Sequence, residues 1–94
     1  MSVTVHLPPP LRPFAGGARQ VTVESTAEST VGDILRAMAI DYPGVVDRTL
    51  TETGSQRQHV NLFVDTENTR HAQGLETPVP PGSSLWIIPA VSGG

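Results

Sequence analysis

The residues best placed to do chemistry in this 94-residue chain lie at its C-terminus. The chain ends on Ala90-Val91-Ser92-Gly93-Gly94, a segment without a charged side chain that follows the strand-like run Leu85-Trp86-Ile87-Ile88. Glycine is entropically costly to order and adds no side chain to a core, so folding stability gives little reason for a pair here. The segment is either a frayed terminus, the commonest fate of chain ends, or a slender arm. Such an arm would present the α-carboxylate of Gly94 to the active site of another protein.

Two residue types are absent, and both absences bear on this choice. The sequence contains no Cys and no Lys. Without Cys there is no thiolate nucleophile, no disulfide and no cysteine-based metal site. Without Lys the chain cannot form a Schiff base or accept an isopeptide bond on a lysine side chain. The terminal carboxylate is therefore the obvious remaining handle for sulfur or acyl chemistry.

No catalytic motif is found elsewhere in the sequence. The patterns G-x-S-x-G, Walker A and H-E-x-x-H are absent. His6, His59 and His71 lack the spacing of metal ligands, and we expect them at the surface or on edge strands. The pair Gly16-Gly17 has no phosphate-loop context and indicates a turn. We therefore predict that the chain is not an enzyme and that it binds no metal or cofactor itself.

Length and charge exclude several classes of function. Ninety-four residues make one small domain, in which a wide internal pocket is not expected. Six Arg and nine acidic residues give a net charge of -3, which argues against nucleic-acid and membrane-surface partners. The apolar runs are far too short to cross a bilayer, and no secretory signal is visible at the N-terminus. A cytoplasmic protein is the expectation.

Alternating polar and apolar residues predict most of the strands. Val3, Val5 and Leu7 point to the same side of a first strand over 2–7, which Pro8-Pro9-Pro10 ends because proline cannot donate to a ladder. A loop over 11–17 then leads to an antiparallel partner strand. The remaining predictions are strands at 20–24, 59–65 and 84–88, a turn at 65–68, a short strand at 69–72, a bend at 74–75 and a rigid turn at 78–82.

One helix is predicted with definite ends. Thr30 is the expected N-cap, with Asp33 three residues later as in a capping box. The apolar face at helical spacing consists of Val31, Ile34, Leu35 and Met38. Asp41-Tyr42-Pro43-Gly44 is expected to end the helix, because the residue before Pro avoids the α region and Gly suits the exit. A short helical turn over 45–50 and a mobile loop over 51–56 follow.

This order of elements predicts an α+β fold of the β-grasp (ubiquitin-like) type. One main helix would cover one face of a four- to five-stranded mixed sheet whose first and last strands lie side by side at the centre. We expect a β-grasp domain over 1–89 and a flexible C-terminal Gly-Gly tail over 90–94.

The same alternation leaves three large apolar side chains on the opposite face of the sheet. If Leu85 and Ile87 face the helix, then Trp86, Ile88 and Phe63 face away from it. Together they would form a patch of the kind that marks a partner-binding surface. The alternative is that the 51–58 loop or the proline-rich segment folds over them.

Several short motifs together resemble a known family. They are Leu11-Arg12-Pro13 with Gly16-Gly17, Val60-Asn61, Gly74-Leu75 and the ending Pro89-Ala90-Val91-Ser92-Gly93-Gly94. With the β-grasp pattern, this ordered set resembles the ubiquitin-like sulfur carrier proteins of the ThiS/MoaD superfamily, and among them the actinobacterial carriers of cysteine biosynthesis. The run Pro8-Pro9-Pro10 carries more proline than that pattern has.

The resemblance implies a specific chemistry and specific partners. An E1-like adenylyltransferase/sulfurtransferase would use ATP and magnesium to adenylate Gly94, with Gly93 as its slender neighbour. A sulfur donor would replace AMP to give a thiocarboxylate, and a downstream sulfur-accepting synthase would receive the sulfur. Ala90, Val91 and Ser92 would thread into the partner with the two glycines.

Three other functions remain open at the level of sequence. The chain could be the small subunit of molybdopterin synthase, with the tail inserted into a catalytic partner. It could be a ubiquitin-like protein modifier whose Gly94 joins lysines of other proteins. It could also be an interaction domain with an incidental tail. The pathway that receives the sulfur, whether to cysteine or to another sulfur-containing metabolite, is not decided by these residues.

Overall fold

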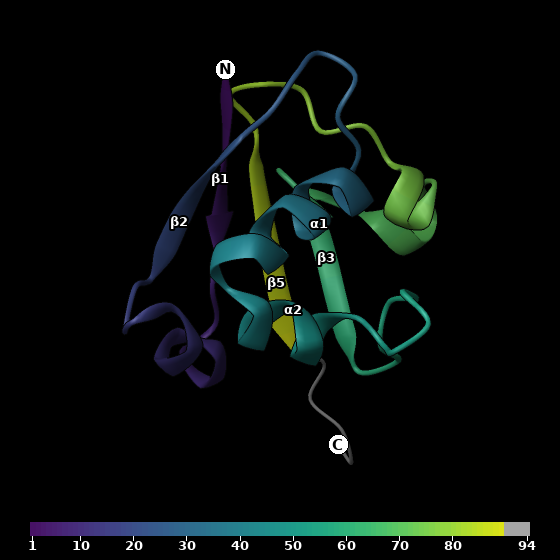
Figure 1. Cartoon of the computed structure of the whole chain (residues 1–94). Helices are drawn as coiled ribbons and strands as arrows, with labels where there is room; N and C mark the ends of the chain where they lie inside the picture. The colour runs from purple at the N-terminus through teal and green to yellow at the C-terminus, as the bar shows by residue number, and fades with distance from the viewer. Residues whose placement is uncertain (90–94) are drawn as a thin grey trace.

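The computed structural model describes residues 1–89, and five strands form one mixed sheet in the order β2-β1-β5-β3-β4 (Figure 1). The central strands β1 and β5 are parallel, and the other neighbours are antiparallel. This confirms the β-grasp arrangement with the first and last strands side by side. The strands are β1 (Ser2–His6), β2 (Gln20–Glu24), β3 (Val60–Val64), β4 (Glu67–Asn68) and β5 (Ser84–Pro89).

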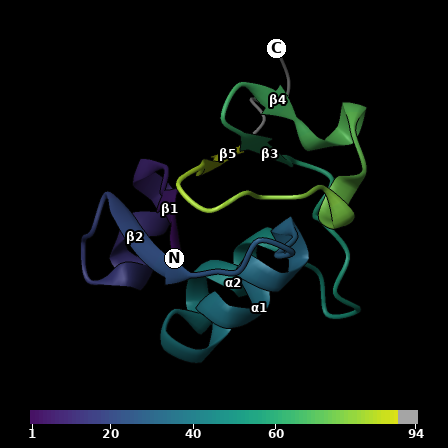
Figure 2. The same ribbon diagram turned by 90° about the horizontal axis from the view of Figure 1, so that it is seen from above.

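The core lies between one face of this sheet and the helices. Val3 and Val5 of β1 and Leu85 of β5 are completely buried, and Ile87 is 2% exposed. The alternation read from the sequence therefore places every second residue inward, as a pleated strand requires. Figure 2 shows α1 and α2 on the same side of the sheet, so the opposite face is left open.

Helix α1 (Val31–Asp41) begins as predicted. The Asp33 backbone N–H donates to Thr30 Oγ1 at 3.2 Å, and the Thr30 N–H donates to Asp33 Oδ2 at 3.0 Å, which completes the capping box. Arg36 Nη2 adds a bond of 2.7 Å to Asp33 Oδ1. The Thr30 backbone N–H, followed by the Arg36 side chain, holds the pKa of Asp33 below its ordinary value of 3.8.

The predicted end of α1 is right, but the role given to Gly44 is wrong. The chain starts a second helix at once, α2 (Pro43–Thr49). Proline suits the first position of a helix because its missing N–H would be unpaired there in any case. Gly44 lies in the first turn of α2 rather than at a helix exit. A Cβ built on Gly44 would lie 2.9 Å from Phe14 Cδ1, so the glycine permits close packing of α2 on the β1–β2 connection.

Three segments differ from the sequence-based expectation in their local form. The loop expected over 11–17 is mainly a 3₁₀ helix, η1 (Pro9–Ala15). The short strand expected at 69–72 is wrong, since Thr69–His71 form the 3₁₀ helix η2 and the strand β4 (Glu67–Asn68) lies within the expected turn. The Asn68 side chain accepts the Arg70 N–H at 3.0 Å and so starts η2 directly after β4. A further 3₁₀ turn, η3 (Gly74–Glu76), stands at the expected bend.

The segment expected to be a mobile loop has internal hydrogen bonds. Leu50 and Gln56 form an isolated β-bridge, and the Thr51 N–H donates to the Ser55 carbonyl at 2.7 Å.

Within residues 1–89, none of the helices has the length and apolar character needed to cross a membrane.

Candidate functional site

Strand β5 positions the base of the predicted reactive tail. It lies between β1 and β3 in the middle of the sheet and ends at Pro89. Its first half pairs with both neighbours, as far as Trp86, and its last residue Pro89 pairs with Val60 of β3, so the sheet fixes the point from which the chain continues. The tail residues singled out by the sequence lie outside the described residues; they are Ala90, Val91, Ser92, Gly93 and Gly94.

The three outward residues predicted for the partner-binding surface do lie on the open face. Phe63 of β3 and Trp86 of β5 are cross-strand partners. Trp86 and Ile88 are each 41% exposed, while Phe63 is half-buried. The 51–58 loop and the proline-rich segment therefore leave Trp86 and Ile88 accessible. We call Phe63, Trp86 and Ile88 the open-face patch; its role in binding a partner stays a prediction.

Trp86 is held by a histidine that the sequence analysis set aside. His6 pairs with Trp86 across β1 and β5, and their rings stack with centroids 3.7 Å apart and planes at 7°. His6 Nε2 also lies 3.2 Å from Ser84 Oγ. The expectation of a surface or edge-strand position is wrong for His6, because β1 is an interior strand and the side chain is half-buried. The stack fixes the indole in one orientation.

The Ser84–His6 pair is a structural contact rather than a catalytic one. A serine activated by histidine needs a third group that orients the imidazole. No carboxylate among the described residues hydrogen-bonds His6, whose ring instead packs on Trp86. Likewise, no group of three or more His, Asp or Glu within 1–89 is arranged to hold a metal ion.

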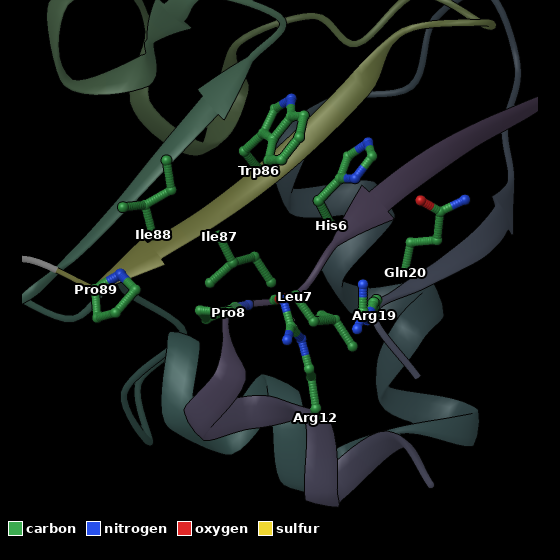
Figure 3. Close-up of a pocket in the computed structure, with 10 residues that line it drawn as sticks. All are labelled: His6, Leu7, Pro8, Arg12, Arg19, Gln20, Trp86, Ile87, Ile88 and Pro89. Carbon is green, nitrogen blue, oxygen red and sulfur yellow. Dashed lines mark hydrogen bonds between the residues drawn. The ribbon is translucent and has the colours of Figure 1, made fainter. Parts of the chain in front are cut away.

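An open groove of about 450 Å³ runs beside this stack, between β5, β1 and the β1–β2 connection (Figure 3). Leu7, Pro8 and Ile87 contribute its apolar lining, and two arginines contribute its charge. Arg12 is anchored, since its Nε donates to the Leu7 carbonyl at 3.1 Å. Arg19 is exposed. We call this the arginine groove and define it by His6, Arg12, Arg19, Trp86, Ile88 and Pro89.

The sequence analysis missed Arg12 and Arg19 as candidate functional residues. Arg12 was noted only as part of a motif, and Arg19 was not singled out. The signal that points to them is the distribution of charge, because the first acidic residue of the chain is Glu24. What brings the two arginines next to Trp86 is the parallel pairing of β1 with β5, a long-range contact.

Known proteins resemble this chain over most or all of its length. Residues 5–94 match the model of the ThiS family. Sulfur carrier protein CysO of Mycobacterium tuberculosis is 35% identical over 96 residues, which cover 100% of each chain. The crystal structure of the BexX/CysO complex of Amycolatopsis orientalis contains a chain with a TM-score of 0.87 and 34% identity, covering 98% of this chain and 99% of that one. Small archaeal modifier protein 1 of Haloferax volcanii is 32% identical over 78 residues, 83% of this chain and 85% of that protein.

Proposed function

We propose that this chain, which belongs to the ThiS family, is a sulfur carrier protein whose C-terminal glycine is converted to a thiocarboxylate. The observation that carries the proposal is the full-length likeness to a sulfur carrier, in a fold whose central strand leads directly into a Gly-Gly tail. The likeness to CysO favours cysteine biosynthesis as the destination of the sulfur.

The proposed chemistry takes place entirely at Gly94. Its α-carboxylate, ionised at neutral pH, attacks the α-phosphorus of ATP in the active site of an E1-like enzyme. A carboxylate–phosphorus bond forms and pyrophosphate leaves, with magnesium and enzyme cations offsetting the phosphate charge. Hydrosulfide from the sulfur donor then attacks the acyl carbon, the bond from that carbon to the AMP oxygen breaks, AMP leaves with loss of a proton, and a thiocarboxylate remains. ATP and magnesium belong to the activating partner, not to the carrier.

The dimensions of the tail suit this role. Five residues beyond Pro89 span on the order of 17 Å when extended, which is enough to enter a tunnel while the folded domain stays outside. Gly93 and Gly94 lack Cβ atoms, so the backbone can pass where a side chain would clash.

The open-face patch, beside the base of the tail, is the surface we assign to docking on the E1-like adenylyltransferase/sulfurtransferase. A downstream sulfur-accepting synthase is the second partner.

Deletion of Gly94 tests the site. It withdraws the carboxylate by roughly 3.3–3.6 Å, and a misplacement of about 1 Å already costs about 100-fold in rate. We expect ATP–pyrophosphate exchange by the partner enzyme to be lost while the amide NMR spectrum of residues 1–89 is unchanged. The control is Ser92→Ala, which keeps the length of the tail. Undiminished exchange with the deletion variant would contradict the proposal.

Intact mass of the protein from its native host tests the product. We expect a species heavier than the unmodified chain by the difference between one sulfur and one oxygen atom, and its loss on treatment with an alkylating reagent specific for thiocarboxylates. Fragmentation must place the extra mass on Gly94. A modification on any other residue would refute the assignment.

A protein modifier is the second candidate function, because small archaeal modifier protein 1 is also a full-fold relative. The two functions need not exclude one another, since both begin with adenylation of Gly94. In cells that express a tagged chain, a modifier gives covalent adducts in which Gly94 is joined to lysines of other proteins. A carrier alone gives the thiocarboxylate and no adducts.

A further inference from the structure

Charge is unevenly distributed along this chain. All nine acidic residues fall between Glu24 and Glu76, whereas residues 1–23 contain two arginines and no carboxylate side chain, and residues 77–94 contain no charged side chain at all. The arginine groove is built from these two segments, which the pairing of β1 with β5 brings together. A protein with a net charge of -3 therefore has a cationic groove beside the last residue before its tail.

Within residues 1–89, neither arginine of this groove has a carboxylate partner. The ion pairs among residues 1–89 join the Met1 amino group to Glu24 and Arg36 to Asp33. Arg12 makes one hydrogen bond, from Nε to the Leu7 carbonyl, which leaves both Nη groups for another acceptor. Arg19 makes no side-chain hydrogen bond within the described part of the chain. A guanidinium binds a carboxylate through two parallel bonds, so both side chains are suited to acids from outside.

The groove also supplies a preorganised apolar contact. His6 holds the Trp86 ring by stacking at 3.7 Å, and the Leu7 carbonyl holds Arg12 at 3.1 Å. Groups that are already fixed lose little conformational entropy when a partner binds. An apolar side chain can therefore lie on Trp86 while a neighbouring carboxylate reaches the arginines, which line the same groove (Figure 3).

We propose that the arginine groove receives an acidic segment of the activating enzyme, with an apolar side chain on Trp86 and a carboxylate on Arg12 and Arg19. This inference rests on the proposed function, since it assumes that an E1-like enzyme takes the tail. Pro89 lines the groove and also ends β5. An enzyme that holds the tail beyond Pro89 must lie against this rim, and an acidic segment there would complement the charge of Arg12 and Arg19.

Charge reversal at Arg19 is the direct test. Arg19→Glu changes an exposed side chain that has no hydrogen-bond or ion-pair partner within residues 1–89, so the fold of these residues is not expected to change. The readout is ATP–pyrophosphate exchange by the purified E1-like enzyme encoded in the same genome, measured at several carrier and salt concentrations. We expect KM for the carrier to rise roughly three- to tenfold at low salt with kcat unchanged, since charges at the rim of an interface act mainly on association. The increase must shrink as salt is added.

Two further variants show whether a change in KM comes from the arginine groove or from net charge alone. Arg36→Glu makes the same change in net charge, but at an exposed side chain of α1 on the helix side of the sheet. Its surface ion pair with Asp33 contributes little to stability, and we expect KM for this variant to stay within twofold of the wild type. Arg12→Gln removes the second guanidinium charge, and a thermal melt reports whether the fold survives. If both groove variants match Arg36→Glu in KM, the inference is wrong.

The remaining outcomes separate this inference from its alternatives. Two results would contradict the proposed function itself: no ATP–pyrophosphate exchange with the wild-type chain, or exchange that persists after deletion of Gly94. A lower KM for Arg19→Glu would mean that the groove holds the carboxylate of Gly94 in the free carrier, which overturns the inference. A wild-type dimer in sedimentation velocity that Arg19→Glu converts to monomer would mean that a second copy fills the groove, and this too would overturn it.

Discussion

Replacing Trp86 by Ala separates docking of the folded domain from chemistry at the tail. Trp86 lies in both the open-face patch and the arginine groove, and it is the only tryptophan of the chain. Its indole stacks on His6 on the open face of the sheet, and 41% of the Trp86 surface is exposed. The variant removes that exposed surface without touching Gly94. We therefore expect weaker binding of the activating enzyme and an unchanged rate at saturating carrier.

The exposed area sets an upper limit on the loss of affinity. A tryptophan side chain buries up to about 250 Å², so 41% exposure leaves roughly 100 Å² for a partner to cover. At about 25 cal/mol per Å² this area is worth about 2.5 kcal/mol, or about 60-fold in Kd. Ordering costs on binding lower the realised value. We expect Kd to rise about 10- to 60-fold and the free energy of unfolding to fall by about 1 to 3 kcal/mol, because the stack on His6 is also lost.

A single fluorinated indole gives the most direct assay. Incorporation of 5-fluorotryptophan places one ¹⁹F nucleus in the carrier, at Trp86, so its resonance reports burial at that side chain alone. We expect the resonance to shift and broaden when the unlabelled activating enzyme is added, and isothermal titration to give Kd for the wild type and for Trp86→Ala. An amide spectrum of the variant shows whether the sheet is intact.

Two isoleucines supply a matched control. Ile88 in the open-face patch is 41% exposed, and Ile40 on α1 is 82% exposed on the helix side of the sheet. Ile88→Ala and Ile40→Ala remove the same atoms, so only the location differs. We expect about a threefold rise in Kd for Ile88→Ala, as the partial burial of an aliphatic side chain allows, and no change for Ile40→Ala. A ¹⁹F resonance unaffected by saturating enzyme, or equal effects of the two isoleucine variants, would refute the docking surface.

Two further predictions concern the scaffold. Gly44→Ala is expected to destabilise the protein by about 1 kcal/mol in urea unfolding, because the contact of 2.9 Å with Phe14 outweighs the better helix propensity of Ala. In a Phe14→Ala background the cost of Gly44→Ala is expected to shrink, because Cδ1 and Cγ are removed and only Cβ at 3.2 Å remains; equal effects in both backgrounds would exclude the clash. Asp33→Asn is expected to lower the free energy of unfolding at pH 7. The lowered pKa of Asp33 stabilises the fold above the ordinary value of 3.8 and ceases to do so as pH falls through the folded-state pKa, so the difference from wild type must narrow in acid.

The parts of the fold that could be predicted are those encoded by local pattern. Alternation around Val3 and Leu85 identifies the inward face of each strand, because one pleated face is buried and the other is not. Thr30 and Asp33 identify the start of α1 because the capping box is complete within four residues. The alternation of inward and outward residues along the last strand also placed Trp86 on the open face.

The parts that could not be predicted depend on contacts between distant segments. Pro43 and Gly44 are typical of a helix end, but Pro43 also suits the first position of α2, and the reason for a glycine at 44 lies in its packing on the distant Phe14. The segment after β4 has strand-like composition, yet it forms the 3₁₀ helix η2, in which Arg70 donates to the carbonyl oxygens of Arg57, Gln58 and Val60 in the segment before and at the start of β3. The role of His6 depends on its register with Trp86, which no local pattern contains.

This division between local and long-range information extends to function. Under the proposed function, a Gly-Gly terminus would undergo the same adenylation whichever pathway it serves, so the tail would not by itself select a partner. Selection is a difference of affinities and must come from the surface that a partner meets when it holds the tail. Around Pro89 that surface is the open-face patch and the arginine groove, where the His6–Trp86 stack lies beside two guanidiniums that form no ion pair within residues 1–89. A change of pathway among related carriers would therefore require changes at Arg12, Arg19 or the face of Trp86 before any change at Gly94.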